Sequence, residues 1–419
     1  MKKSIAICVV ILINVFALKA QDTNYVTGYA PEFIGKKVTL YTYSDYLTMQ
    51  RIKLDETIVQ EDSLFKLKNL VKSTVQVVIE VGNTETELYL QKERDYTFEY
   101  YRPKNAPITF ANQIVEVLFY GLESDDINYR VLQYNQWFDR FVSAKREGIR
   151  KHGFPVYLDT FKIYAYDAYK DIDAPYFTNY VRYNIALMER TTVKRKDDGV
   201  AGRTYLEYIH PYPVYTKNDQ YMKFVKSYYS KDFESYQSKI KTLVYMAIDT
   251  ASPTLLMKAL RYDPVMQIPE LREMMMVNML GNSYYKRGYG RKNIVTILDS
   301  VSRFSKFRSS AVAAHNMLGY LTKLENGYPA PEIEFFRENG DKVNWITYKG
   351  KFVYVNFFAS WNESSVTQMK LLNDLKIKYG DYVSFLSFCT DNSREEYDKY
   401  IANNKEFNCE YIKLQNSIS

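Results

Sequence analysis

Cysteine and histidine are scarce in this sequence, with three of each among 419 residues. Once an apolar N-terminal segment containing Cys8 is set aside, only Cys389 and Cys409 remain, which are too few to build a disulfide scaffold. The histidines are scattered and lack the spacing of metal ligands, so we expect neither a metal site nor a bound cofactor. They are His152, His210 and His315.

Long apolar runs are also lacking, and no segment after the N-terminus approaches the roughly 20 apolar residues that span a bilayer. Residues 1–20 have the plan of a signal peptide, with Lys2 and Lys3, an apolar core from Ile5 to Leu18, and cleavage expected near Ala20. We therefore expect an exported protein of the periplasm or cell envelope with no transmembrane span.

Charge of one sign is not in large excess. The 56 basic and 49 acidic residues give a formal net charge of +7, which falls to +4 without residues 1–20 because these contain three lysines and no acid. The densest basic stretch, "VKRKDD" (Val193 to Asp198), neutralises part of its own charge. Nucleic acid is therefore not an expected partner.

Alternation of apolar and polar residues predicts β-strands over residues 22–105. Examples are "KKVTLYTY" (Lys36 to Tyr43) and "LFKLKNL" (Leu64 to Leu70), and Gly82-Asn83 is expected at the bend of a hairpin. Five or more short strands predict a small antiparallel β-sandwich.

Apolar residues recur at helical spacing over residues 110–325, which predicts an all-α middle domain. Pro269 is expected in the first turn of a helix that contains the methionine-rich stretch Leu271 to Leu280. We expect those methionines to fill helix–helix contacts. One predicted apolar helix face consists of Ile127, Val131, Tyr134 and Phe138.

A linker, "ENGYPAP" (Glu325 to Pro331), introduces an α/β segment over residues 330–419. "KFVYVNFF" (Lys351 to Phe358) is a continuous apolar run, which predicts a strand buried on both faces. A helix over residues 363–379 and a second buried strand, "YVSFLSFC" (Tyr382 to Cys389), are expected next. A second helix and the start of a third strand complete the pattern.

This last segment resembles the thioredoxin-like domain of exported disulfide reductases of the TlpA/ResA type. The matching residues are Ala330-Pro331, Gly340 to Val343, and "YKGKFVYVNFFASW" (Tyr348 to Trp361), followed by a strand that ends in Asp391. Multidomain members of this family have a similar layout of signal peptide, small β domain, helical middle and C-terminal thioredoxin fold. The resemblance implies a multidomain α and β protein with a thioredoxin-like C-terminal domain.

The reaction of this family requires a Trp-Cys-x-x-Cys element, whose first thiolate attacks a substrate disulfide and whose second cysteine resolves the mixed disulfide. Here the element from Trp361 to Ser365 is "WNESS". Because an amide and a hydroxyl form no mixed disulfide, dithiol exchange at Asn362 and Ser365 is chemically excluded. Both are favourable helix-start residues, and Ser360-x-x-Glu363 matches a capping box.

The resemblance also implies a cis-proline loop, an antiparallel hairpin and a final helix, yet no proline follows Asp391 before Ser419. We therefore expect an incomplete thioredoxin-like domain, and we favour a truncated or decaying gene over a domain that is incomplete by design. An incomplete sheet exposes an unpaired edge.

The favoured function is that of an exported thioredoxin-fold protein that has no catalytic residue. It binds or scaffolds extended peptide or protein segments beside Trp361 or at the open sheet edge, or it is vestigial. The alternative is a residual thiol–disulfide oxidoreductase that uses Cys389 and Cys409, although we expect Cys389 to be a buried, inert thiol. The sequence indicates no particular oligomeric state.

Overall fold

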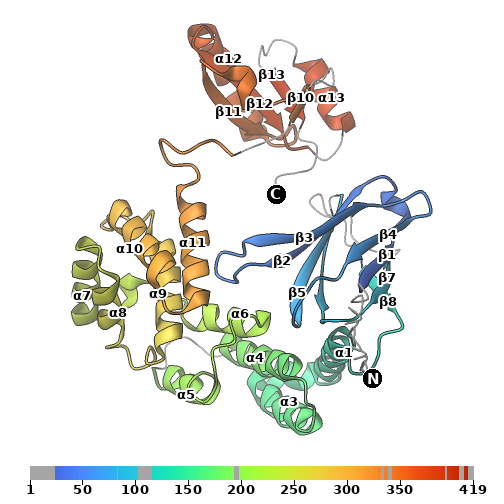
Figure 1. The fold of residues 1–419 in the computed structure, drawn as a ribbon, viewed down its shortest axis with the longest axis vertical. Coiled ribbons are helices and arrows are strands. Elements are labelled where there is room, and N and C mark those ends of the chain that lie inside the picture. Colours follow the sequence, from blue (N-terminus) through green and yellow to red (C-terminus); the bar gives the residue numbers. More distant parts are fainter. Residues whose placement is uncertain are drawn as a thin grey trace, which may run out of the picture.

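The computed structural model describes residues 24–82, 84–101, 116–192, 198–331, 335–337, 342–391, 394–404 and 410–413. The expected signal peptide and its cleavage point near Ala20 lie outside these residues. The described chain forms a β-sandwich, a group of helices and an α/β domain, in that order along the sequence (Figure 1). The predicted fold class, a multidomain protein of α and β parts, is confirmed.

The β-sandwich contains two four-stranded sheets, one with the strand order β4-β1-β7-β8 and the other with the order β3-β2-β5-β6. Apolar side chains from both sheets, such as Val26, Leu40 and Phe98, form one buried core. Gly82 follows β5 with a φ of 58°, a left-handed conformation that suits glycine in the predicted hairpin bend. The strands are β1 (Tyr25–Tyr29), β2 (Lys37–Tyr43), β3 (Arg51–Ile58), β4 (Leu64–Lys68), β5 (Val75–Val81), β6 (Thr84–Leu90), β7 (Tyr96–Tyr101) and β8 (Glu116–Tyr120).

Two features of the sandwich differ from the sequence-based expectation. β8 lies in the range for which helices were expected, yet it pairs antiparallel with β7. Its side chains alternate, with Phe119 packed against the core and Leu118 exposed, so its period of two does not fit the helical pattern around it. In addition, β1 pairs in parallel with β7, which makes the first sheet mixed. No local pattern encodes a pairing between segments so far apart in the sequence.

The described residues between β8 and the linker form eleven α-helices. Three residues of the predicted face, Ile127, Val131 and Tyr134, are buried, and Phe138 packs beside them. Among the described helices, none combines the length and the apolar character needed to cross a membrane. The helices are α1 (Ile127–Ala144), α2 (Arg146–His152), α3 (Phe154–Tyr169), α4 (Pro175–Thr192), α5 (Asp198–Tyr208), α6 (Asp219–Tyr228), α7 (Ser238–Asp249), α8 (Pro253–Leu260), α9 (Pro269–Ser283), α10 (Arg291–Phe304) and α11 (Arg308–Thr322).

Helix α9 confirms the interpretation of the methionine-rich stretch. Pro269 lies in its first turn, where the missing backbone N–H costs no helical hydrogen bond. Met275 and Met276 are fully buried in the largest hydrophobic core of the described residues, together with Met274 and Met279. These side chains therefore fill the space between helices, as expected.

The close packing of β1 leads to a first prediction, for the variant Gly28→Ala. A Cβ atom at Gly28 would lie 2.2 Å from Cζ of the buried Phe65 ring, so the ring must move. We expect the variant to lower the free energy of unfolding by about 1–3 kcal/mol in urea denaturation. Gly319→Ala in α11 is the control, because nothing lies within 4 Å of its added Cβ and the helix gains up to about 1 kcal/mol. Equal stability of the two variants would contradict the prediction.

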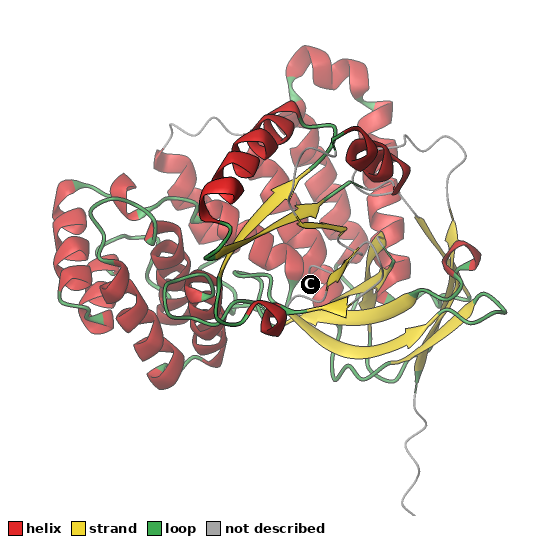
Figure 2. Ribbon diagram, turned by 90° about the horizontal axis from the view of Figure 1, so that it is seen from above, coloured by secondary structure: helices red, strands yellow, loops and turns green. Residues whose placement is uncertain are grey.

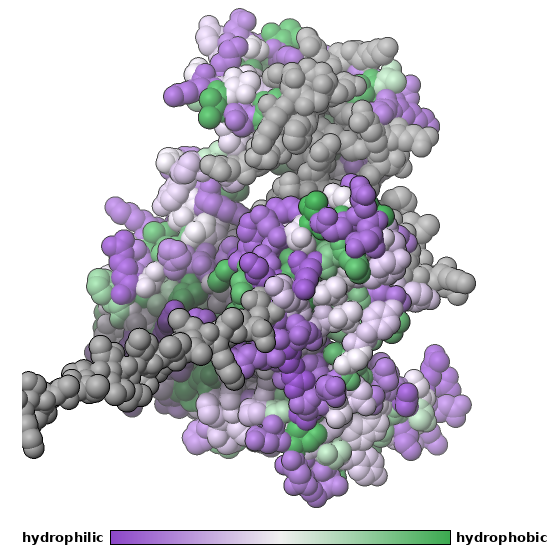
Figure 3. Space-filling model, turned by 45° about the vertical axis from the view of Figure 1, so that its right-hand side comes forward, coloured by the Kyte–Doolittle hydropathy of each residue, from purple (hydrophilic) through white to green (hydrophobic). Residues whose placement is uncertain are grey.

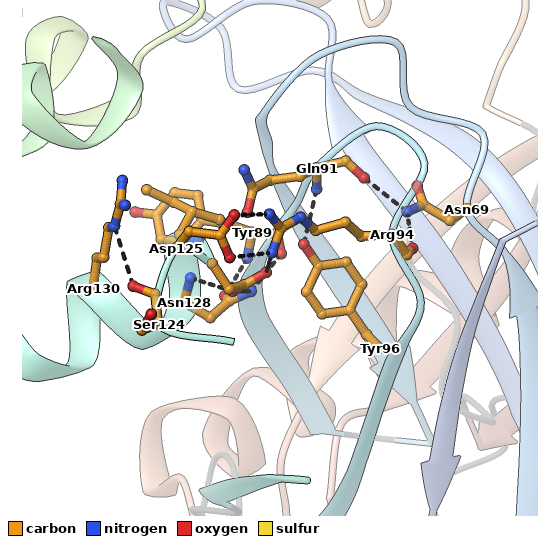
Figure 4. Close-up of polar contacts among 11 residues, drawn as sticks. Asn69, Tyr89, Gln91, Arg94, Tyr96, Ser124, Asp125, Asn128 and Arg130 are labelled. Atoms are coloured by element: carbon orange, nitrogen blue, oxygen red, sulfur yellow. Dashed lines mark hydrogen bonds and ion pairs between the residues drawn. The ribbon is translucent and has the colours of Figure 1, made fainter. Parts of the chain in front are cut away.

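The β-sandwich is joined to the helices at the start of α1 (Figure 4). The main chain of Tyr89 exchanges two hydrogen bonds with the Asn128 side chain, since Tyr89 N donates to Oδ1 at 2.9 Å and Nδ2 donates to Tyr89 O at 2.8 Å. Arg94 also forms a bidentate ion pair with Asp125, in which Nη1 donates to Oδ1 at 3.0 Å and Nη2 donates to Oδ2. These contacts hold the β6–β7 turn against the first turn of α1.

A fully buried carboxylate, that of Asp219 in α6, lies between the same two parts. Its Oδ2 accepts a hydrogen bond from the Tyr89 hydroxyl at 3.1 Å, and its Oδ1 accepts one from the Tyr176 hydroxyl at 3.1 Å. Gln220 Nε2 (3.0 Å) and Lys223 Nζ (3.4 Å) also donate to Oδ2. Burial and the nearby Asp219 charge raise the pKa of both tyrosines well above its usual range, so both phenols remain donors.

The turn between β2 and β3 makes a third contact with the helices. Lys226 Nζ in α6 donates to Tyr46 O at 3.0 Å and to Leu47 O at 3.2 Å, and burial lowers the pKa of this lysine. Asn316 Nδ2 in α11 donates to Asp45 Oδ2 at 2.8 Å. The sandwich and the helices therefore lie side by side as one packed unit, as the views in Figures 1 and 2 also show. We call it the β–helical unit.

After the linker, a five-stranded sheet has the order β10-β9-β13-β12-β11, with β11, β12 and β13 parallel. α12 connects β11 to β12, and α13 connects β12 to β13, as the sequence predicts. On the face of the whole molecule that Figure 3 shows, hydrophobic side chains lie in small groups among hydrophilic ones. The elements are β9 (Phe335–Arg337), β10 (Lys342–Val343), the 3₁₀ helix η3 (Trp345–Tyr348), β11 (Phe352–Phe358), α12 (Glu363–Tyr379), β12 (Val383–Cys389), α13 (Arg394–Asn403) and β13 (Glu410–Lys413).

Candidate functional site

Asn362 and Ser365, the positions at which the resemblance implies cysteines, lie where β11 ends and α12 begins. Asn362 is the N-cap of α12, and its Oδ1 accepts hydrogen bonds from Ser364 N at 3.1 Å and Ser365 N at 3.2 Å. Ser365 lies in the first turn and is partly buried, whereas Trp361 is 70% exposed. The helix-start role predicted for Asn362 is therefore confirmed.

The predicted capping box from Ser360 to Glu363 is not formed, and that prediction is wrong. Asn362 has an extended backbone (φ −98°, ψ 104°), so the helix begins two residues later than the box requires. Ser360 N donates instead to Oδ1 of the buried Asp391, at 2.9 Å. Asp391 lies two residues after β12, so this hydrogen bond connects the end of β11 to the end of β12.

The start of α12 has the polar geometry that stabilises an anion, but a neutral amide occupies it. Backbone N–H groups and the helix dipole lower the pKa of a thiol at such a position. Here the Asn362 carboxamide oxygen accepts from two of those N–H groups. The amide satisfies the helix terminus and provides no nucleophile.

Cys389 is the last residue of β12 and lies opposite Phe358 in the strand register. Its thiol is buried, and Sγ accepts a hydrogen bond from Asp391 N at 3.5 Å. Cys409 lies outside the described residues.

β11 is the last strand of the sheet, and only β12 pairs with it among the described strands. The prediction that this apolar run is buried on both faces is wrong, because Phe352 is 79%, Tyr354 46% and Phe357 50% exposed. Burial on both faces requires cover on each side and a neighbouring strand at each edge. β12 lies between β11 and β13 and is buried, as expected.

The backbone of β11 alternates between its neighbour and the open side. Phe352 N donates to Tyr382 O at 3.2 Å, and Phe358 O accepts from Thr390 N at 2.9 Å, so residues of even number direct their polar groups toward β12. Val353, Val355 and Phe357 must then direct N–H and C=O away from it. We call the outward backbone of these three residues the β11 edge. No described strand pairs with it, and such an edge is a template for another strand.

Other site chemistry has little support in the structure. Within the described ranges, no three side chains of His, Cys, Asp or Glu gather into a group that could hold a metal ion. The arrangement at the end of β11 can cap a helix, expose an indole and offer a strand edge. These features suit non-covalent binding.

Comparisons with known proteins give a likeness in fold only. No protein-family model and no curated protein sequence matches the chain. Among solved structures, the thioredoxin domain of a thiol-disulfide oxidoreductase from Bacteroides vulgatus is similar at 24% identity and a TM-score of 0.20, over 21% of this chain and 63% of that one. A thioredoxin-like protein from Bacteroides caccae is similar at 9% identity and a TM-score of 0.27, over 56% of this chain and 76% of that one.

Another solved structure from Bacteroides vulgatus, also described as a thiol-disulfide oxidoreductase, is similar at 24% identity and a TM-score of 0.21. The match covers 22% of this chain and 66% of that one, so the chain spans just under two thirds of the length of this neighbour. The structural neighbours are thus thioredoxin-like. Because these scores are low, the argument for function rests on the geometry of this chain.

Proposed function

We propose that the C-terminal domain binds an extended protein segment along the β11 edge, without thiol–disulfide exchange at residues 362 and 365. The observation that carries this proposal is the edge itself, where Val353, Val355 and Phe357 direct backbone groups outward and no described strand pairs with them. An added strand would gain main-chain hydrogen bonds there, and its alternate side chains would provide specificity.

Aromatic side chains on both faces of β11 support this mode of binding. Tyr354 packs against Phe385 with ring centroids 5.6 Å apart, and Phe357 stacks on Phe388 at 5.5 Å. Each of the two β11 rings therefore contacts a ring of β12, and about half of its surface stays exposed. A bound strand would cover these exposed surfaces, and Trp361 would add an apolar contact at the end of the strand.

Two observations favour binding over the alternative of residual thiol chemistry. The Asn362 amide takes the N–H groups that would stabilise a thiolate, and Cys389 is buried. In the exported location that residues 1–20 predict, the C-terminal domain would act as a binding module attached to the β–helical unit.

The proposal predicts that an unfolded polypeptide binds to the full chain in a way that depends on the Val355 N–H. The probe is reduced and carboxymethylated α-lactalbumin, which has no thiol or disulfide to exchange, and binding is measured by fluorescence anisotropy. Val355→Pro removes an outward donor without touching the hydrogen bonds to β12, so we expect binding to weaken about tenfold or more. Val355→Thr, the matched control, keeps the N–H and the side-chain volume and should bind like the wild type.

Binding that Val355→Pro leaves unchanged, or no binding by the wild type at concentrations low enough to keep it monomeric, would overturn the proposal. Insulin disulfide reduction by the same preparations tests the alternative. Turnover that disappears when Cys389 and Cys409 are both changed to serine would favour the oxidoreductase, and we expect no turnover in either protein.

A further inference from the structure

The β11 edge is complementary to itself, and this identifies a partner. We propose that two copies of the chain pair through their β11 edges, antiparallel and centred on Val355, to form a closed dimer. The inference rests on the function proposed above and names the extended segment that occupies the edge as β11 of a second copy.

The outward-facing residues set the register of this pairing. With Val355 opposite Val355 of the second copy, Val353 lies opposite Phe357, and each of these pairs can exchange two N–H···O hydrogen bonds. All three outward residues are then used on both copies. A shift by two residues leaves one of them without a partner on each copy, so the register centred on Val355 satisfies the most backbone groups.

The side chains agree with this register. Val353 of one copy lies beside the half-exposed Phe357 ring of the other, and a β-branched residue next to an aromatic one is a favourable cross-strand pair. The two Val355 side chains meet at the two-fold axis on the same face. On the opposite face, the half-exposed Tyr354 lies next to Asn356 of the second copy.

Charges at the two ends of β11 favour the antiparallel arrangement. The exposed Lys349 and Lys351 precede the strand, and the exposed Glu363 follows it in the first turn of α12. Antiparallel pairing brings the lysines of each copy toward Trp361 and Glu363 of the other, whereas parallel pairing places lysines beside lysines. Residues 352–358 contain no charge and no proline, the features that usually keep an edge from pairing.

The pairing also closes the assembly. Both β11 edges are occupied in a two-fold symmetric interface, so no β11 edge remains to which a third copy could bind. The other end of the sheet is β10, which has only two residues and offers little edge for further growth. A dimer is therefore expected, and not a fibre.

Sedimentation velocity of the full chain over a wide concentration range tests the inference. We expect a monomer–dimer equilibrium for the wild type and for Val355→Thr, and a dissociation constant about tenfold higher or more for Val355→Pro. The charge argument adds a second test. Lys349→Glu combined with Lys351→Glu should weaken the dimer, and adding Glu363→Lys should restore it.

Loss of the dimer in Val355→Pro together with rescue by the charge exchange supports the pairing. A wild type that stays monomeric, a dimer that Val355→Pro leaves intact, or a charge exchange without rescue overturns it. The unfolded probe separates this result from the proposed function. If the wild type is monomeric and binds the probe, and Val355→Pro weakens this binding, only the inference of a β11–β11 dimer fails. If the monomeric wild type does not bind the probe, the proposed function fails as well.

Discussion

Replacing Asp219 with alanine is expected to lower the free energy of unfolding of the β–helical unit by about 3–5 kcal/mol. The phenols of the buried Tyr89 and the partly buried Tyr176 both lose their acceptor, and an unsatisfied buried donor costs about 1–3 kcal/mol. The deleted carboxylate also leaves a space between β6, α4 and α6. The effect is large because one side chain serves both parts of the unit.

Urea denaturation, combined with hydrogen exchange of amides in β6 and α6, measures this change and assigns it to the β–helical unit. Asp299→Ala in α10 is the matched control, since its carboxylate is half exposed and pairs with Arg303 four residues on. Such a pair is worth about 0.5 kcal/mol. Asp219→Asn should lie between the two, because it keeps one acceptor. If Asp219→Ala lowers the free energy of unfolding no more than Asp299→Ala does, the buried carboxylate does not stabilise the contact between the β-sandwich and the helices.

The thiol introduced by Asn362→Cys is expected to have a pKa below about 7.5, against about 8.5 for an ordinary cysteine. The amides of Ser364 and Ser365, now bound by Asn362 Oδ1, would stabilise the thiolate, and the dipole of α12 acts in the same direction. The pH dependence of iodoacetamide alkylation, followed at this residue by peptide mass spectrometry, measures the pKa.

Lys378→Cys, in the last turn of the same helix, is the matched control for this variant. The carbonyl groups at the end of a helix disfavour a thiolate, so its pKa should stay at or above about 8.5. At pH 7 we therefore expect alkylation about tenfold faster at position 362. Equal pKa values at the two positions would mean that the start of α12 does not have the polar character that its hydrogen bonds indicate.

These two variants probe different parts of the molecule, but together they bear on what kind of protein this is. If the introduced thiol at position 362 is activated, the site retains the helix geometry for thiol chemistry and lacks only the side chains. The lack of a thiol at position 362 would then limit the chemistry of this site, because the first turn of α12 is already formed.

Much of the fold could be predicted because the relevant signals are local. Helical spacing located the buried face of α1, alternation located β2 and β4, and Pro269 marked the start of α9. β8 was missed because five alternating residues lie next to a long stretch of helical pattern. The parallel pairing of β1 with β7 was missed because it joins distant segments.

The candidate site was predicted in part for the same reason. The start of α12 and the capping role of Asn362 follow from residues that are neighbours in the chain. The hydrogen bond from Ser360 to Asp391 spans 31 residues and has no local signal. The exposure of Phe352 could not be predicted either, since an apolar run is the same in sequence whether its strand lies in the middle of a sheet or at its edge.

The sequence by itself determined that positions 362 and 365 hold no thiol. Without cysteines at positions 362 and 365, no fold can perform dithiol exchange there. Only the tertiary structure decided what the domain offers instead, because the order of the described strands pairs β11 with β12 alone and directs the backbone of Val353, Val355 and Phe357 away from β12. The reason is that a missing functional group is a property of a single residue, whereas an open edge depends on which strands pair, and that depends on contacts along the whole domain.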